Sequence, residues 1–123
     1  MSIGETSSHG RDKALKGNSG THSPGRFAQL VAQANPRLKF DAYSHHPYPV
    51  PPNQKPTQRV LWPNVSLASL PRFEQSLDAW FRRKNVPIWI TEYALMQWIL
   101  ERFAREIDAL YAYLIARAKR LGD

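Results

Sequence analysis

The stretch that decides the fold is Val86-Pro87-Ile88-Trp89-Ile90-Thr91-Glu92-Tyr93-Ala94, which predicts a buried strand that ends on a carboxylate. Pro87 suits the first residue of a strand, where no ladder N–H is required. The apolar run that follows is typical of a parallel strand covered on both faces. In parallel α/β folds, ligands bind beyond the carboxyl ends of the strands. Glu92 therefore stands where a catalytic carboxylate is expected, although the same pattern fits a Glu that simply leaves the sheet into solvent.

Two further strands and two helices are predicted before this stretch. The strands lie near residues 2–5 and 38–43, and apolar residues at helical spacing predict a helix after each of them. Ser23-Pro24 is typical of a helix start, with Ser23 as N-cap, and Asn35-Pro36 ends that helix. Because helices connect the three strands, we expect the strands to be parallel neighbours in one sheet, the last of them near residues 87–92.

Each of these two helices is predicted to bury one apolar face. The residues are Phe27, Leu30, Val31 and Ala34 in the first helix, and Phe73, Leu77, Trp80 and Phe81 in the second, which opens at Pro71. We expect Arg82-Arg83-Lys84 to end the second helix, since cations are favourable at the negative end of the helix dipole. Asn85 is then its C-terminal cap.

Residues 47–70 are predicted to form a long, stiff loop over the carboxyl ends of the strands. Six of the ten prolines fall between Pro47 and Pro63, which excludes a helix and disfavours a central strand. A loop this long in a compact domain is usually either functional or disordered. Tyr48 and Trp62 offer flat apolar rings against which a sugar could stack, although Trp62 could equally pin the loop to the body of the protein.

The last segment, residues 95–121, contains no Gly or Pro and predicts one long helix. Its apolar residues form a single face, which comprises Met96, Ile99, Leu100, Phe103, Ile107, Leu110, Tyr111, Leu114 and Ala118. The sequence therefore divides into an α/β unit over residues 1–94 and an amphipathic helix over residues 95–123, packed on that unit or extending from it.

Three of the predicted strand ends resemble those of a known enzyme family. Residues 88–93 are similar to the nucleophile strand of the retaining (β/α)8-barrel glycoside hydrolases of the cellulase-like clan. His46-Pro47-Tyr48 resembles the His-x-Tyr that ends the preceding barrel strand, and Ile3-Gly4-Glu5-Thr6 resembles the strand before that. The resemblance covers residues 1–94 and strands 5 to 7, and implies a partial TIM barrel, since a complete barrel needs about 250 residues. Relatives continue after this strand with Gly and a polar loop, whereas here Ala94 leads directly into an apolar helix.

The resemblance implies a glycosidase that hydrolyses O-glycosidic bonds in β-linked oligosaccharides or polysaccharides and that uses no cofactor or metal. Glu92 matches the nucleophile of this family, and His46 and Tyr48 match the residues that orient it. Retaining enzymes need a second carboxyl group, which this family carries in an Asn-Glu pair. No such pair occurs here, so the acid is either absent or Glu5, and we expect the chain alone to be inactive. The residues interpreted as substrate-binding are Glu5, His45, Trp62 and Tyr93.

Composition limits the other functions open to the chain. Its 123 residues suffice for one modest domain, and the absence of cysteine excludes disulfides and thiolate metal sites. The net charge of +7 is scattered along the sequence, so we expect neither a nucleic-acid nor a membrane partner. No secretory signal is visible, while the resemblance implies an extracellular location. Three strands leave two sheet edges unpaired, which predicts self-association through these edges or through the last helix.

Two other classes of function stay open. A metal could be held by histidine and carboxylate, which suit zinc, and the candidates are His9, His22, His45, His46 and Glu92. Against this, adjacent histidines in a strand point to opposite faces of the sheet. The other class is a non-catalytic carbohydrate-binding or protein-interaction module, with the long helix as its contact surface. Such a module would bind an oligosaccharide without turning it over.

Overall fold

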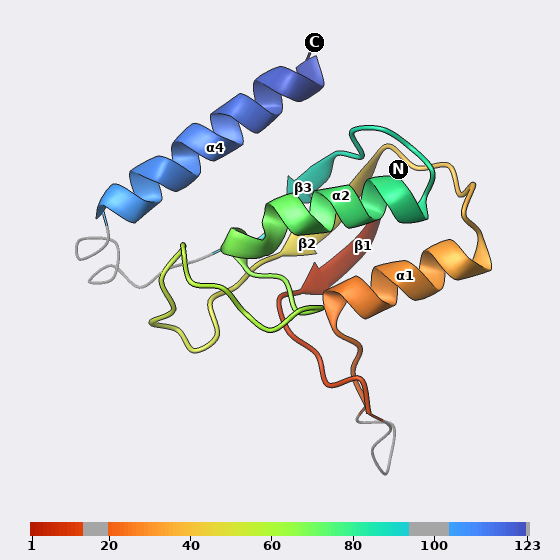
Figure 1. The fold of residues 1–123 in the computed structure, drawn as a ribbon, viewed down its shortest axis with the longest axis horizontal. Coiled ribbons are helices and arrows are strands. Elements are labelled where there is room, and N and C mark those ends of the chain that lie inside the picture. The colour runs from red at the N-terminus through yellow and green to blue at the C-terminus, as the bar shows by residue number, and fades with distance from the viewer. Residues whose placement is uncertain (14–19, 94–103, 123) are drawn as a thin grey trace.

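The computed structural model of the protein describes residues 1–13, 20–93 and 104–122. The elements in chain order are β1 (Ser2–Ser7), α1 (Pro24–Ala34), β2 (Ala42–His46), the 3-10 helix η2 (Leu67–Ser69), α2 (Leu70–Trp80), β3 (Ile88–Ile90) and α4 (Ala104–Gly122). Helices α1 and α2 pack against each other across one face of the sheet (Figure 1). Helix α4 lies beside β3 and contacts α2 through side chains.

The three strands form one parallel sheet in the order β1-β2-β3, which confirms the predicted parallel arrangement. β2 pairs on both sides, so β1 and β3 each keep one edge without a partner in the described part of the chain. The described strands form an open sheet and do not close into a barrel. β2 begins later than predicted, at Ala42, because the chain still turns after α1, where the N–H of Leu38 donates to the carbonyl of Asn35 at 3.2 Å.

The ends of α1 agree with the prediction, but its N-terminal cap does not. The helix begins at Pro24 and ends at Ala34. Ser23 occupies the N-cap position without capping the helix, because its side chain is used elsewhere. Its hydroxyl donates to Asp12 Oδ2 at 2.6 Å, and its backbone N–H donates to Asp12 Oδ1 at 2.8 Å. This pair ties the loop after β1 to the start of α1.

The buried face of α1 is made of small residues rather than the larger ones that its spacing suggests. Ala28 is 0% and Ala32 is 3% exposed, whereas Phe27 is 36% exposed. The backbone approaches its neighbours closely here, since a Cβ at Gly25 would lie 2.7 Å from Pro63. Only a small side chain fits on that face of the helix.

The hydrophobic core lies between the sheet and the helices α1 and α2. Phe73 of α2 packs edge to face on Tyr43 of β2, with ring centroids 5.4 Å apart. Phe81 meets Phe40 in the same way at 4.9 Å. The predicted apolar face of α2 is confirmed for Phe73, Leu77 and Phe81, all of which are 2% exposed or less.

The connection from α2 to β3 differs from the prediction. α2 ends at Trp80, so the basic residues expected in its last turn follow the helix instead. Arg82 has a φ of 52° and Asn85 a φ of 57°, both in the left-handed region. The Asp78 carboxylate fixes this turn, because it accepts the backbone N–H of Asn85 at 2.9 Å and that of Val86 at 2.7 Å. At the other end of α2, η2 occupies part of the segment that the sequence predicts as loop.

Helix α4 is attached to the body of the protein by a buried polar link. Arg117 is 8% exposed; it pairs with Glu74 of α2 and donates to the carbonyl of Val86 at 2.9 Å. Tyr113 donates to the same Glu74 carboxylate at 2.9 Å. Tyr111 is 60% exposed, although the sequence places it on the apolar face of this helix. The predicted helical segment 95–103 lies outside the described residues, and none of the described helices is long and apolar enough to cross a membrane.

Candidate functional site

Residues from all three strands meet at the carboxyl end of the sheet. The hydroxyl of Tyr48, just after β2, donates to Glu92 Oε2 at 3.0 Å. His46 Nδ1, at the end of β2, lies 3.9 Å from the same oxygen. This confirms the predicted meeting of Glu92 with Tyr48 and His46, which follows from the rule that parallel strands share one carboxyl edge.

Glu5 of β1 completes this group. His46 Nε2 lies 2.6 Å from Glu5 Oε2, and the hydroxyl of Thr91 donates to the same oxygen at 3.3 Å. His46 therefore has one carboxylate at each ring nitrogen, with Nε2–H as the donor toward Glu5. The side chain of His46 is 15% exposed, whereas those of Glu5 and Glu92 are 54% and 57% exposed.

A bulge in β1 aims Glu5 at His46. The register of β1 against β2 shifts between Gly4 and Thr6, and Gly4 and Glu5 have φ values of 102° and 54°. Bulges of this kind re-aim side chains and are common beside active sites. A non-glycine residue in the left-handed region costs on the order of 1–3 kcal/mol, which the surrounding structure must offset. Apart from the presence of Gly4, no sequence pattern predicts this bulge.

The surroundings of Glu5 favour its anion. The Ser44 hydroxyl makes no regular hydrogen bond, yet its proximity is the main cause that lowers the pKa of Glu5, with His46 and Thr91 adding to the effect. An ionised Glu5 does not fit the role of a general acid, which must carry a proton. In contrast, the hydrogen bond to Glu92 raises the pKa of Tyr48, so its hydroxyl stays protonated and remains a donor.

His45 is not a substrate-binding residue, which corrects the prediction from sequence. Its ring is 0% exposed, with Nδ1 2.9 Å from Thr6 Oγ1 and Nε2 2.9 Å from the carbonyl of Val65. Burial lowers the pKa of His45 to about 4, so the ring is neutral near pH 7. Nε2–H then donates to Val65, and Nδ1 accepts from Thr6. His45 holds the long loop against β2 and cannot reach a ligand.

Trp62 and Tyr93 also pack into the body of the protein. The Trp62 ring lies 6.5 Å from Phe73 and 6.4 Å from Trp80, and the Arg72 guanidinium lies 4.2 Å from its centroid. Of the two roles weighed for Trp62, these contacts support pinning the loop. Tyr93 packs partly buried against the core, and burial raises its pKa to about 12. These contacts give both residues a structural role, and the substrate-binding role expected from the sequence stays a prediction.

Two buried serines beside the site, Ser44 and Ser8, were not predicted from the sequence. Ser44 lies two positions before His46, so the alternation of a strand places both on one face and could have identified it. Ser8 carried no such signal. The Ser8 hydroxyl is buried and donates to the carbonyl of Tyr48 at 2.7 Å. His9 Nδ1 lies 2.9 Å from the Ser8 hydroxyl oxygen. Ser8 thereby fixes the backbone that presents Tyr48 to Glu92.

The histidines considered as metal ligands have other neighbours. His9 contacts Ser8, and His22 lies 3.7 Å from Asp12. Within residues 1–13, 20–93 and 104–122, no group of three or more His, Asp or Glu side chains is placed to hold a metal ion.

Comparisons of the chain with protein-family models, with curated proteins and with solved structures found no match. The functional interpretation therefore depends on the sequence motifs and on the geometry of the carboxyl end of the sheet.

Proposed function

We propose that the protein is a retaining glycoside hydrolase of the barrel type, present as part of a barrel, with β-linked oligosaccharide or polysaccharide as its substrate. The observation that supports this most is the hydrogen bond from Tyr48 to Glu92, with His46 beside the same carboxylate oxygen. The Tyr48 hydroxyl, as a donor, stabilises the Glu92 carboxylate as an anion, and a nucleophile must be ionised. The motif resemblance assigns the same roles to the same three residues. An extracellular location follows from the resemblance and stays a prediction.

In this proposal Glu92 attacks the anomeric carbon of the sugar. A bond forms from a Glu92 oxygen to that carbon as the bond from the carbon to the leaving oxygen breaks, and an acid protonates the leaving oxygen. Water then attacks the same carbon and gives a proton to the conjugate base of that acid, while the bond from the carbon to Glu92 breaks. Tyr48 donates to the carboxylate and holds it in place before the attack, while His46 lies beside it and is held by Glu5.

The protonating acid is the part of this scheme that the described residues do not supply. Glu5 is the carboxyl group nearest to the site, but its lowered pKa favours the anion. General-acid help typically contributes ~10²–10⁴-fold to such a reaction. We therefore expect the chain on its own to leave natural glycans unhydrolysed and to react only with substrates whose leaving group needs no proton.

The alternative function is a non-catalytic carbohydrate-binding or protein-interaction module. The exposure of both carboxylates favours it, since the side chains of Glu5 and Glu92 are each more than half exposed. A water-filled site gives electrostatic groups less catalytic effect than a desolvated one. The two functions differ in one observable, because a module binds oligosaccharide but forms no covalent bond to it.

Covalent labelling tests the proposal. 2,4-Dinitrophenyl 2-deoxy-2-fluoro-β-glycosides carry a leaving group that departs without an acid, and the fluorine slows release of the glycosyl-enzyme. We expect one or more of the gluco, manno, xylo and galacto reagents to label the chain slowly, with the sugar on Glu92 by peptide mass spectrometry. Tyr48→Phe should slow the labelling, because the nucleophile loses a donor.

Two variants serve as controls for the labelling experiment. Glu92→Gln should abolish the label, whereas Asp108→Asn, which changes an exposed carboxylate on α4 outside the site, should leave the labelled position unchanged. Labelling of Glu92→Gln at the wild-type rate would refute the nucleophile assignment. Oligosaccharide binding seen by NMR, without any label from the four reagents, would favour the non-catalytic module.

A further inference from the structure

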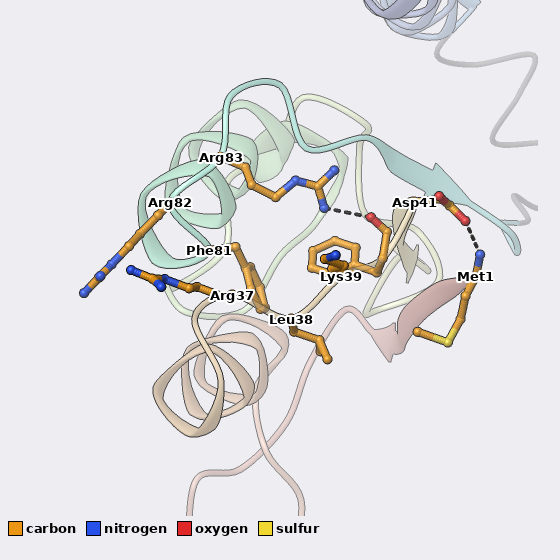
Figure 2. A pocket seen from close by; sticks show the side chains of 9 residues that line it. Met1, Arg37, Leu38, Lys39, Asp41, Phe81, Arg82 and Arg83 are labelled. Carbon is orange, nitrogen blue, oxygen red and sulfur yellow. Dashed lines mark hydrogen bonds and ion pairs between the residues drawn. The ribbon is translucent and has the colours of Figure 1, made fainter.

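A concave site lies at the opposite end of the sheet from Glu92. A cavity of about 640 Å³ opens between the loop that precedes β2 and the loop that precedes β3 (Figure 2). The buried rings of Phe40 and Phe81, 6% and 2% exposed, are part of its lining. Because the two loops precede the strands and the candidate site follows them, this cavity is independent of the proposed glycosidase chemistry.

The lining of this cavity is strongly basic. Arg37 and Lys39 come from one loop, and Arg82 and Arg83 from the other. Asp41 is the acidic residue in the lining, and it pairs with the amino group of Met1. Figure 2 shows Arg37 and Arg82 extending in the same direction from the two loops. Four cations around one acid that is already paired leave a marked excess of positive charge.

Three of these cations are available to a ligand. Arg83 is held in place, because its Nη1 donates to the carbonyl of Phe40 at 2.8 Å and its guanidinium lies 4.7 Å from the Phe40 ring centroid. In contrast, Arg37, Lys39 and Arg82 are exposed and have no carboxylate within ion-pair distance among the described residues. Arg83 therefore stiffens the wall while the other three face solvent.

Helix dipoles explain only part of this charge. Helices α1 and α2 both end at this side of the sheet, and a cation near the last turn of a helix is favourable. One cation at each helix end would suffice for that effect. The remaining cations repel one another, and that repulsion is relieved when an anion lies among them.

The backbone conformation of Arg82 is a separate indication that this cavity is a binding site. Its φ of 52° lies in the left-handed region, where glycine is the usual residue just after a helix. A glycine would adopt this conformation with less strain, but it would place no charge at the cavity. Strained residues of this kind cluster at binding sites.

We propose that this cavity, bounded by Arg37, Lys39, Arg82 and Arg83, binds an anion that carries two or more phosphate or sulfate groups. The planar fork of a guanidinium matches two oxygens of such a group, and the Lys39 ammonium adds a point charge. The three available cations come from both loops, which suits a ligand with charge at two places. The carboxyl end of the sheet, with Glu5 and Glu92, would repel the same ligand.

Calorimetric titration with two probes tests the proposal and distinguishes the sources of the anion. Inorganic pyrophosphate represents phosphate, and a sulfated heparin tetrasaccharide represents sulfate. We expect saturable 1:1 binding of at least one probe at low salt, weakening as added salt screens the charges. Combining Arg37→Gln with Arg82→Gln should weaken that binding about tenfold or more. Failure of both probes to bind at low salt would overturn the proposal.

Two controls separate a built site from general attraction to a basic protein. Arg11→Gln combined with Arg59→Gln removes two exposed charges outside the cavity and should leave the affinity nearly unchanged. An equal loss in both double variants would overturn the proposal. Arg82→Gly relieves the strained φ, so it should fold at least as stably in urea and still bind the probe more weakly. Unchanged affinity in Arg82→Gly and in the double variant would also overturn it.

Discussion

The adjacent histidines of β2 show how much one position changes the role of a side chain. His46 lies between two carboxylates at the end of the sheet, whereas His45 points into the core and bonds to Thr6 and Val65. The alternation of a strand predicts that the two differ. It does not predict which of them faces the core, since that depends on where the loop 47–66 folds back.

Burial of neutral His45 makes the stability of the protein depend on pH. The pKa of His45 is lowered from 6.5 to about 4, so the unfolded chain binds a proton in this range before the folded protein does. The stabilisation is therefore complete above pH ~6.5 and is lost as the pH falls toward ~4. We expect the free energy of unfolding in urea to fall by about 2 kcal/mol from this group between pH ~8 and pH ~5.

The variant His45→Gln isolates this contribution. Glutamine keeps a donor and an acceptor but does not titrate, so its stability should be lower at pH ~8 and should change less toward pH ~5. Subtracting the two pH profiles removes the effect of the carboxylates and of His9. Parallel pH profiles for the two proteins would contradict the prediction, because they would mean that His45 binds its proton equally well in the folded and the unfolded protein.

At the scale of elements, the bulge in β1 is the feature on which the candidate site depends. A Cβ on Gly4 would lie 2.7 Å from the Tyr43 ring and 2.8 Å from the carbonyl oxygen of Ser44, and the φ of 102° is unfavourable for any other residue. We expect Gly4→Ala to lower the free energy of unfolding by about 3 kcal/mol or more, through overpacking and backbone strain. Urea denaturation followed by circular dichroism measures this.

Gly122 provides the matched control for this substitution. A Cβ there would meet nothing within 4 Å, so Gly122→Ala should change the free energy of unfolding by less than about 0.5 kcal/mol. An equally small effect of Gly4→Ala would show that β1 tolerates a regular register. In that case Glu5 would not need the bulge to reach His46.

The elements that could be predicted from sequence are those fixed by local chemistry. The prolines predicted the first residue of α1 and, within one residue, that of α2. The helices that connect the strands predicted that the strands are parallel. That order brought Glu92, His46 and Tyr48 together, because parallel strands share one carboxyl edge. The bulge at Gly4 and the small buried face of α1 could not be predicted, since both depend on how closely distant segments approach. The turn after α2 depends on Asp78, a residue whose position suggests only a surface helix.

At the scale of the whole molecule, the open sheet predicts self-association. β1 and β3 each keep an edge without a partner in the described part of the chain, and Trp89 on β3 is 51% exposed. Exposed edge strands with large apolar side chains pair readily with other chains. We expect sedimentation of the wild-type chain to depend on concentration, with dimers or larger species at the higher concentrations.

A charge on the β3 edge should prevent this association. Trp89→Lys places a lysine where natural edge strands often carry one, and it should shift the sedimentation toward the monomer. Leu61→Lys is the control, since Leu61 is 84% exposed and belongs to the long loop rather than to a strand. A wild-type chain that remains monomeric at all concentrations would contradict the prediction, as would equal effects of the two substitutions.

The bulge in β1 also has a consequence for the period when the chain is being synthesised. Thr6 and His45 are 39 positions apart, so at ~5–20 residues per second β1 waits for seconds before β2 has been made. Parallel pairing must also close a loop of this length before any contact compensates for it. A regular strand exposed for that time is a template for pairing with other nascent chains. Because the bulge breaks the register of β1, it makes the waiting strand a poorer template and lowers the risk of aggregation on the ribosome.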